Sequence, residues 1–409
     1  MDLTQYPLFL FVGGVPEGAH IPLAMLIVFG SAKLLAELFE KFGQPGIVGE
    51  ILAGIIVGPS MLNLIAPDNL LTALADLGAM FLLFHVGLEV KASELMKVGG
   101  TATLVAVLGV IVPQVLGWAI LRAYGASQIE AIFVGAAMVA TSVGITAQVL
   151  AGKGLLQHKA SQIILAAAVI DDVLGLLVLA VVSSLAKGQV NIAGIVTTAV
   201  MASAFTIIVA VLGTRAVNRV LPRVTSTLRA GEVQFNLSMI LMFGLALLAV
   251  YAGVAAIIGA FLAGMALGES AGDRVRDLAH GVTELLVPFF LAGIGLHLDI
   301  TAFADFGVIG LAVVVLGAAI VSKLAGCGLG AWTLGKADML RVGVGMVPRG
   351  EVGMVVAQLG LALGVIPNKI YGVVVFMAVM TTVIAPMLLN LAFRGVGPIE
   401  AKKDHFRLG

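Results

Sequence analysis

The stretch LAAAVIDDVLGLLVLAVV, residues 165–182, is apolar throughout except for Gly175 and the adjacent acids Asp171 and Asp172. A helix of about 20 apolar residues spans the roughly 30 Å hydrocarbon core of a bilayer. By insertion scales, a charged side chain at the centre of such a helix costs about 3 kcal/mol. Two adjacent carboxylates in this position therefore indicate a functional site inside a membrane.

The composition indicates a membrane protein along the whole chain. Of 409 residues, 60% are hydrophobic and only 11% are charged, whereas soluble domains average about 25% charged residues. These features predict an all-α, multi-pass protein of the cell inner (plasma) membrane, with the lipid bilayer as its surroundings. Hydropathy and turn signals predict about thirteen transmembrane helices: 21–40, 46–64, 70–89, 98–122, 130–151, 160–186, 191–213, 233–250, 253–269, 279–297, 306–331, 340–364 and 370–393.

The charges predict an orientation and exclude some partners. Basic residues favour the cytoplasmic side, and most of the 23 Lys and Arg residues lie there if the N-terminus is outside and the C-terminus is cytoplasmic. Lys33 lies within a span, four residues before Glu37, and we expect the two to pair. Acidic and basic residues are equal in number, so we expect no nucleic-acid partner.

An internal repeat relates the two halves of the chain. ILAGIIVGPS at 51–60 resembles FLAGMALGES at 261–270, and HVGLEV at 85–90 resembles GIGLHL at 293–298. The matching spans are seven apart, an odd number, so they cross the membrane in opposite directions. The sequence therefore predicts inverted-topology repeats, which place the site of many transporters near the midplane on discontinuous helices.

The repeat predicts that spans 5 and 12 are the discontinuous pair. VGAAMVATSVGITAQVL and VGVGMVPRGEVGMVVAQL each continue from a GxxMV motif into polar or helix-breaking residues, and Met138 and Met346 occupy equivalent positions. We expect both helices to unwind where they cross. Glu351 and Arg349 are placed to offset the partial charges of the half-helix ends.

The charged residues inside the spans predict an exchange mechanism. Successive residues of a helix point about 100° apart, so one of the two aspartates can pair with a protein cation while the other faces a cavity. Lys323 is the natural protein cation. Carboxylate oxygens suit hard cations, so the second aspartate can bind Na⁺ or a proton but not both.

Four motifs in order resemble one family. ATSVGIT, IDDVLGL, VSKLAGCG and GMVPRGEVGMV resemble the NapA-type sodium/proton antiporters of the cation:proton antiporter superfamily, in its monovalent cation:proton antiporter-2 group. The resemblance implies one transmembrane unit over 1–400 with a short cytoplasmic tail at 401–409. It also implies a homodimer, with the following parts: dimerisation part 20–90 and 231–298, core ion-translocation part 98–186 and 303–395, and linker helix 191–222.

The resemblance also implies residue roles. Asp172 would be the principal cation and proton carboxylate, with Thr141 near the ion, and Asp171 would form a salt bridge with Lys323 that exchanges with ion and proton binding. Glu351 and Arg349 would stabilise the crossed helices. No cofactor is implied, and no metal beyond the transported Na⁺ at Asp172.

These observations lead to a ranked set of functions. The first is a secondary active antiporter that exchanges cytoplasmic Na⁺ (or Li⁺) for external H⁺ by an elevator-type alternating-access mechanism. The resemblance to family members with an Asp-Asp pair and a lysine implies that this exchange is electrogenic. A K⁺/H⁺ antiporter is the alternative, followed by a sodium-coupled organic-anion symporter of similar fold. We expect no enzyme, because HExxH does not occur and the two aspartates are adjacent on one helix rather than facing each other from two helices.

Overall fold

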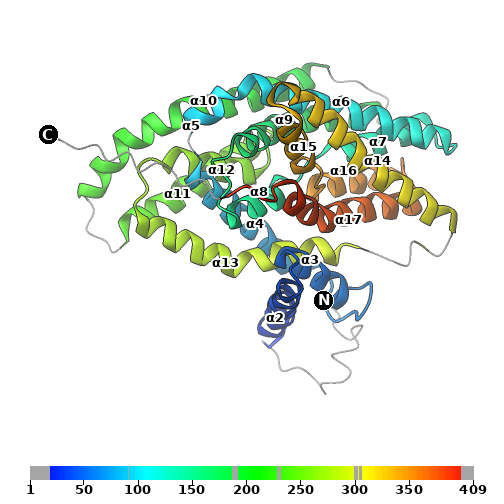
Figure 1. The fold of residues 1–409 in the computed structure, drawn as a ribbon, viewed down its shortest axis with the longest axis horizontal. Coiled ribbons are helices and arrows are strands. Elements are labelled where there is room, and N and C mark those ends of the chain that lie inside the picture. The colour runs from blue at the N-terminus through cyan, green and yellow to red at the C-terminus, as the bar shows by residue number, and fades with distance from the viewer. Residues whose placement is uncertain are drawn as a thin grey trace.

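The computed structural model describes residues 19–90, 92–186, 192–227, 232–298, 303 and 306–397, and every regular element in these ranges is a helix (Figure 1). The all-α prediction is confirmed. The elements are α2 (His20–Lys41), α3 (Gly46–Val57), α4 (Asn69–Glu89), α5 (Ala92–Lys97), α6 (Gly99–Ala123), α7 (Gln128–Val139), α8 (Val143–Gly152), α9 (Lys159–Ala186), α10 (Ile192–Thr227), α11 (Val233–Tyr251), α12 (Ala256–Leu267), α13 (Asp273–Leu296), α14 (Phe306–Gly330), the 3₁₀ turn η3 (Trp332–Leu334), α15 (Lys336–Gly345), α16 (Glu351–Ala362) and α17 (Asn368–Ala392).

Many of these helices have the length and composition of membrane spans. Within the described residues, ten helical segments are long and apolar enough to cross a bilayer, and three further apolar helices are shorter. Each span expected from hydropathy overlaps one helix or two consecutive ones, α7 with α8 and α15 with α16. α3 ends at Val57, before the expected end at 64, and α10 continues to Thr227, beyond the expected end at 213. Thirteen as the number of crossings stays a prediction.

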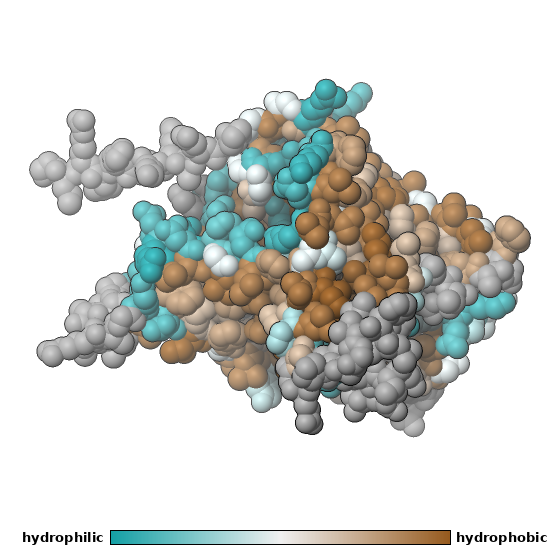
Figure 2. Space-filling view, turned by 90° about the horizontal axis from the view of Figure 1, so that it is seen from below, coloured by the Kyte–Doolittle hydropathy of each residue, from teal (hydrophilic) through white to brown (hydrophobic). Residues whose placement is uncertain are grey.

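The surface is suited to lipid over much of its area. Figure 2 shows a broad hydrophobic surface with hydrophilic residues gathered on one part of it. Large apolar side chains are exposed on α2 and α11, such as Leu34 at 74% and Ile240 at 68%. A soluble protein rarely exposes continuous apolar surface of this kind, so these faces fit a hydrocarbon environment.

Close helix packing reproduces the internal repeat in three dimensions. Gly54 of α3 lies against the carbonyl of Ala292 in α13, and Gly264 of α12 lies against the carbonyl of Phe84 in α4. A side chain at either glycine would collide with that carbonyl. The two contacts are equivalent under the repeat, since the glycines correspond to each other and so do their partners. Each half of the chain thus packs against the other in the same way, through small residues that let helix backbones approach.

Candidate functional site

Two helices are interrupted in the interior, and the interruptions contact each other. α7 ends at Val139 and α8 begins at Val143, while α15 ends at Gly345 and α16 begins at Glu351. The backbone N–H of Ser142 in the first interruption donates to the carbonyl of Pro348 in the second, at 2.8 Å. Irregular backbone at membrane depth is tolerated only where protein or a watery cavity surrounds it.

The local sequence explains why the second helix stops here. Pro348 lacks a backbone N–H and cannot continue the helical hydrogen-bond ladder. Gly350 follows, and a Cβ there would lie only 2.6 Å from the Cβ and Oγ of Ser142. The close approach of the two interruptions therefore requires glycine at this position.

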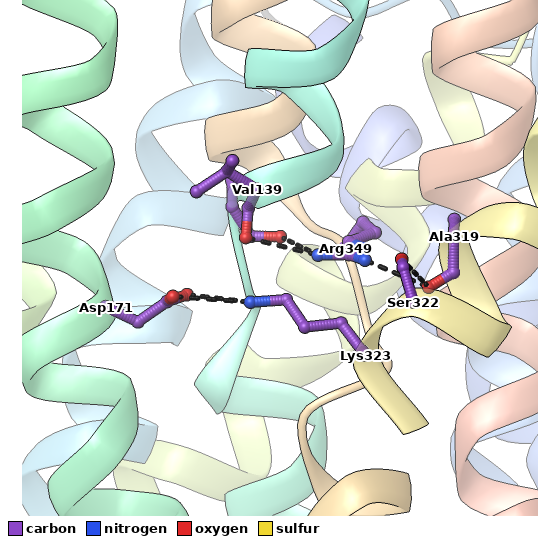
Figure 3. A network of polar contacts seen from close by, with 7 residues as sticks. Val139, Asp171, Ala319, Ser322, Lys323 and Arg349 are labelled. Atoms are coloured by element: carbon purple, nitrogen blue, oxygen red, sulfur yellow. Dashed lines mark hydrogen bonds and ion pairs between the residues drawn. The ribbon is translucent and has the colours of Figure 1, made fainter. Parts of the chain in front are cut away.

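Arg349 is fully buried between the two interruptions. Its Nη1 donates to the carbonyls of Val139 and Ala140, both at 3.1 Å, and its Nη2 donates to the carbonyl of Ala319 at 3.0 Å (Figure 3). The guanidinium therefore lies at the C-terminal end of α7, where the helix dipole places partial negative charge. The arrangement satisfies carbonyls that the end of α7 leaves without a helical partner.

Glu351 occupies the first position of α16, but its side chain lies outside the described part of the structure. The predicted offset of a half-helix dipole by this carboxylate therefore stays a prediction, although its position in the first turn is one where an acid is favourable.

Thr141 belongs to the first interruption and is buried, at 4% exposure. Its Oγ1 has no hydrogen-bond partner among the described residues. A buried hydroxyl without a hydrogen-bond partner reduces the stability of the folded protein. It therefore offers an oxygen with available lone pairs at the point where the backbone unwinds.

Asp171 and Lys323 form a buried ion pair. The Nζ of Lys323, on α14, lies 3.3 Å from both carboxylate oxygens of Asp171, on α9 (Figure 3), and the two side chains are 0% and 1% exposed. α6 packs against both helices, and its Gly109 makes room for the pair, because a Cβ there would lie 3.3 Å from Nζ and 2.7 Å from the Sγ of Cys327.

Asp172 differs from its neighbour in burial. Asp171 is buried, whereas Asp172 is only half-buried. The structure thus brings the two adjacent carboxylates into different surroundings, as the angle between successive helical residues requires.

An open cavity of about 1120 Å³ lies between α2, α3, α4 and α13 on one side and α8 and α17 on the other. Gln148 contributes to its wall from α8, seven residues after Thr141. Acidic residues outnumber the basic ones in the lining: Glu37, Glu40, Glu50, Glu89, Asp277 and Glu284 against Lys33, Lys153 and Arg276. The cavity therefore favours cations.

The expected pairing of Lys33 with Glu37 is wrong. Lys33 Nζ lies 3.0 Å from Glu50 of α3 and 3.6 Å from Glu284 of α13, while Glu37 pairs with Lys41 at 3.3 Å. Glu50 is almost fully buried, so its charge needs a partner more than the exposed Glu37 does. Tertiary contact therefore overrides the local spacing of four residues.

Comparison with known proteins identifies the family. A model described as "Sodium/hydrogen exchanger, transmembrane" matches residues 25–394. The chain belongs to the sodium/hydrogen exchanger family. It is 33% identical to the high-affinity Na⁺/H⁺ antiporter NhaS3 of Synechocystis sp., over 94% of this chain and 92% of that protein. It is also 33% identical to the Na⁺/H⁺-K⁺ antiporter GerN of Bacillus cereus, over 90% and 95%.

A solved structure supports the fold. The sodium proton antiporter MjNhaP1 of Methanocaldococcus jannaschii superimposes with a TM-score of 0.65, over 95% of this chain and 97% of that one, at 16% identity. At this identity the likeness concerns the fold alone. Membership of the cation:proton antiporter superfamily, read from the four motifs, is confirmed, and the family is one of membrane transporters rather than enzymes.

Sequence reasoning missed two kinds of residue in the site. Gly109 had no distinguishing signal among the 51 glycines of the chain. Thr381, whose Oγ1 accepts the backbone N–H of Arg349 at 3.1 Å, lies in an apolar helix where a threonine is unremarkable in sequence. Only the position of the interruption beside α17 reveals its contact.

Proposed function

We propose that the chain exchanges cytoplasmic Na⁺ (or Li⁺) for external H⁺ and that Asp172 is the carboxylate for which the two ions compete. The observation that carries the proposal is the difference between two adjacent acids. Asp171 is held by Lys323 in a buried pair, while half-buried Asp172 lies next to it on the same helix. A single carboxylate that binds either a cation or a proton couples their movements in opposite directions.

The surroundings of the pair support a site for a hard cation. Na⁺ prefers oxygen ligands, as other hard cations do, and Thr141 supplies a buried hydroxyl oxygen in the first interruption. Arg349 donates hydrogen bonds to the carbonyls at the C-terminal end of α7. These carbonyls are therefore occupied, and the carboxylate of Asp172 is the ligand that holds the cation. If Na⁺ binding displaces one proton from Asp172 and Lys323 also releases its proton, two protons move against one Na⁺, which would make transport electrogenic.

Helix packing supports an elevator-type movement. α3, α4, α12 and α13 pack against one another, and α6, α9, α14, α15 and α17 form a second group that carries Asp171, Asp172 and Lys323. The acidic cavity lies between the two groups. We assign the first group to a homodimerisation part of the molecule and the second to a moving core.

In the proposed orientation, the cavity opens toward the cytoplasm. With the N-terminus outside and the C-terminus in the cytoplasm, the cavity opens at the cytoplasmic ends of its helices, for example at Lys41 of α2 and Gly152 of α8. Cytoplasmic cations would then be concentrated near the core by the acidic lining. The plasma membrane is the location that this direction of exchange requires.

Transport by Asp172→Asn tests the proposal. In proteoliposomes with an imposed pH gradient, we expect Na⁺ or Li⁺ to dissipate the gradient with the wild-type protein and not with this variant, because the amide can neither bind a proton at this site nor carry the charge that holds Na⁺. Asp68→Asn is the matched control, since Asp68 caps α4 and asparagine caps equally well. A folded wild-type protein that responds to no alkali cation would overturn the proposal.

Potassium is the second candidate cation. The relative GerN is named as an Na⁺/H⁺-K⁺ antiporter, and nothing in a carboxylate and a hydroxyl by itself excludes the larger ion. A response to K⁺ alone in the same proteoliposomes, absent in Asp172→Asn, would assign K⁺/H⁺ exchange through the same site.

A further inference from the structure

The C-terminal end of α15 lacks a donor that a continuous helix would provide. In an α-helix the carbonyl of Gly345 would accept the N–H four residues later, which belongs to Arg349. That N–H instead donates to the Oγ1 of Thr381 on α17, at 3.1 Å. The Gly345 carbonyl is buried, so it needs another donor or it costs free energy.

Thr146 supplies this donor from the opposite repeat. Its Oγ1, on α8, donates to the Gly345 carbonyl at 2.7 Å, and the residue is 0% exposed. The buried hydroxyls of Thr381 and Thr382, by comparison, donate to carbonyls of their own helix, those of Ala378 and Val379. The hydrogen bond of Thr146 instead joins two interrupted helices.

The two interruptions therefore stabilise each other reciprocally. Arg349 of the second repeat donates to the carbonyls that end α7 in the first, and Thr146 of the first repeat donates to the carbonyl that ends α15 in the second. We propose that Thr146 is a positioning residue for cation exchange, the counterpart of Arg349, which holds the end of α15 against α8 and thereby sets the geometry of the site. This inference rests on the proposed function.

The hydroxyl acts on the site through the backbone. Thr146 is on the helix that begins directly after the interruption containing Thr141, and Gly345 ends the helix that precedes the interruption containing Arg349. Removing the hydroxyl leaves a buried carbonyl without a donor, and the end of α15 must move to find one. Since α15 and α8 carry the two interruptions, the positions of the ion-facing groups change with it.

Thr146→Val tests the positioning role of Thr146, because it removes the hydroxyl while the side chain keeps nearly the same shape. We expect the KM for Na⁺ to rise about tenfold, the cost of one buried hydrogen bond, while Thr146→Ser retains the wild-type KM. Because Na⁺ and H⁺ compete for Asp172, weaker Na⁺ binding should also move the half-maximal pH of exchange to higher pH. Thr382→Val is the matched control, because it removes a buried hydroxyl that bonds only within α17.

The outcomes separate this inference from the proposed function. If Thr146→Val keeps the wild-type KM and pH profile while Asp172→Asn is inactive, the positioning role is wrong and the antiporter proposal stands. An equal change in KM with Thr382→Val would also refute it, since general loss of packing would then explain both. If Thr146→Val does not fold, Thr146→Ala takes its place, and a wild-type KM in that variant overturns the inference. A wild-type protein without exchange refutes the proposed function itself.

Discussion

At the scale of single residues, the buried ion pair depends on space as much as on charge. Lys323 and Asp171 meet in an interior where a lone charge would cost several kcal/mol. Gly109 provides the room for them, because a Cβ at this position would press against the Sγ of Cys327 and the Nζ of Lys323. The pair is therefore sensitive to one methyl group on a third helix.

Gly109→Ala should disturb this pair. The new Cβ would lie 2.7 Å from Cys327 Sγ and 3.3 Å from Lys323 Nζ, and overpacking of this kind costs about 1–3 kcal/mol. We expect a lower melting temperature and slower exchange, measured on the purified protein and in proteoliposomes. Gly317→Ala, on the helix of Lys323, is the control, because nothing lies within 4 Å of its Cβ. Equal behaviour of the two variants would contradict the steric argument.

At the scale of elements, α9 carries both aspartates and begins with an unusual cap. The Nδ1 of His158 accepts the backbone N–H of Ala160 at 3.1 Å, so the imidazole must be neutral to serve as the cap. The ring also packs edge-on against Phe393, at 5.7 Å between centroids. Burial lowers the pKa of His158, nearby Asp338 raises it, and nearby Arg341 lowers it again, with a net fall below the usual value of 6.5.

This cap predicts a pH dependence of stability. Because the pKa of His158 is lower in the folded protein, the unfolded chain binds more protons as pH falls through about 6.5, and stability is lost in the acid direction. His158→Asn keeps a capping side chain that does not titrate. We expect the melting temperature of the wild type to fall more than that of this variant as pH drops below neutral. Parallel curves for the two proteins would rule out this role of the histidine.

At the scale of the whole molecule, the acidic cavity lies between two groups of helices that the elevator proposal moves against each other. Ile47 lines it from α3 of the first group, and Val149 lines it from α8, which packs against α9 and α17 of the second group. The chain has one cysteine, the fully buried Cys327, which thiol reagents in solution do not reach. Pairs of cysteines can therefore be introduced without removing it.

Cross-linking across the cavity should stop exchange. With Ile47→Cys and Val149→Cys together, a flexible bifunctional thiol reagent would tie the two groups, and we expect transport to be lost, while a monofunctional reagent has little effect. Ile47→Cys with Val287→Cys is the control, because both positions line the cavity from the first group. Exchange that continues in the cross-linked pair would exclude relative movement of the two groups.

By itself, the sequence determined the class of the protein and the course of its helices. Hydropathy is a local property summed over one segment, so the spans from 21–40 to 370–393 could be located, and the repeat and the breaks around Pro348 followed from spacing. The buried charges Asp171 and Lys323 were visible because charge is rare in apolar helices. These features need no knowledge of which surfaces meet.

The tertiary structure alone decided the contacts between elements. Lys33 pairs with Glu50 rather than with Glu37, because burial of the more distant acid outweighs helical spacing. Likewise Thr146 bonds Gly345 across 199 residues, and one glycine among many makes room for the ion pair. Such contacts depend on the packing of distant segments, which neither periodicity nor composition specifies, and the proposed ion exchange depends on the geometry that they set.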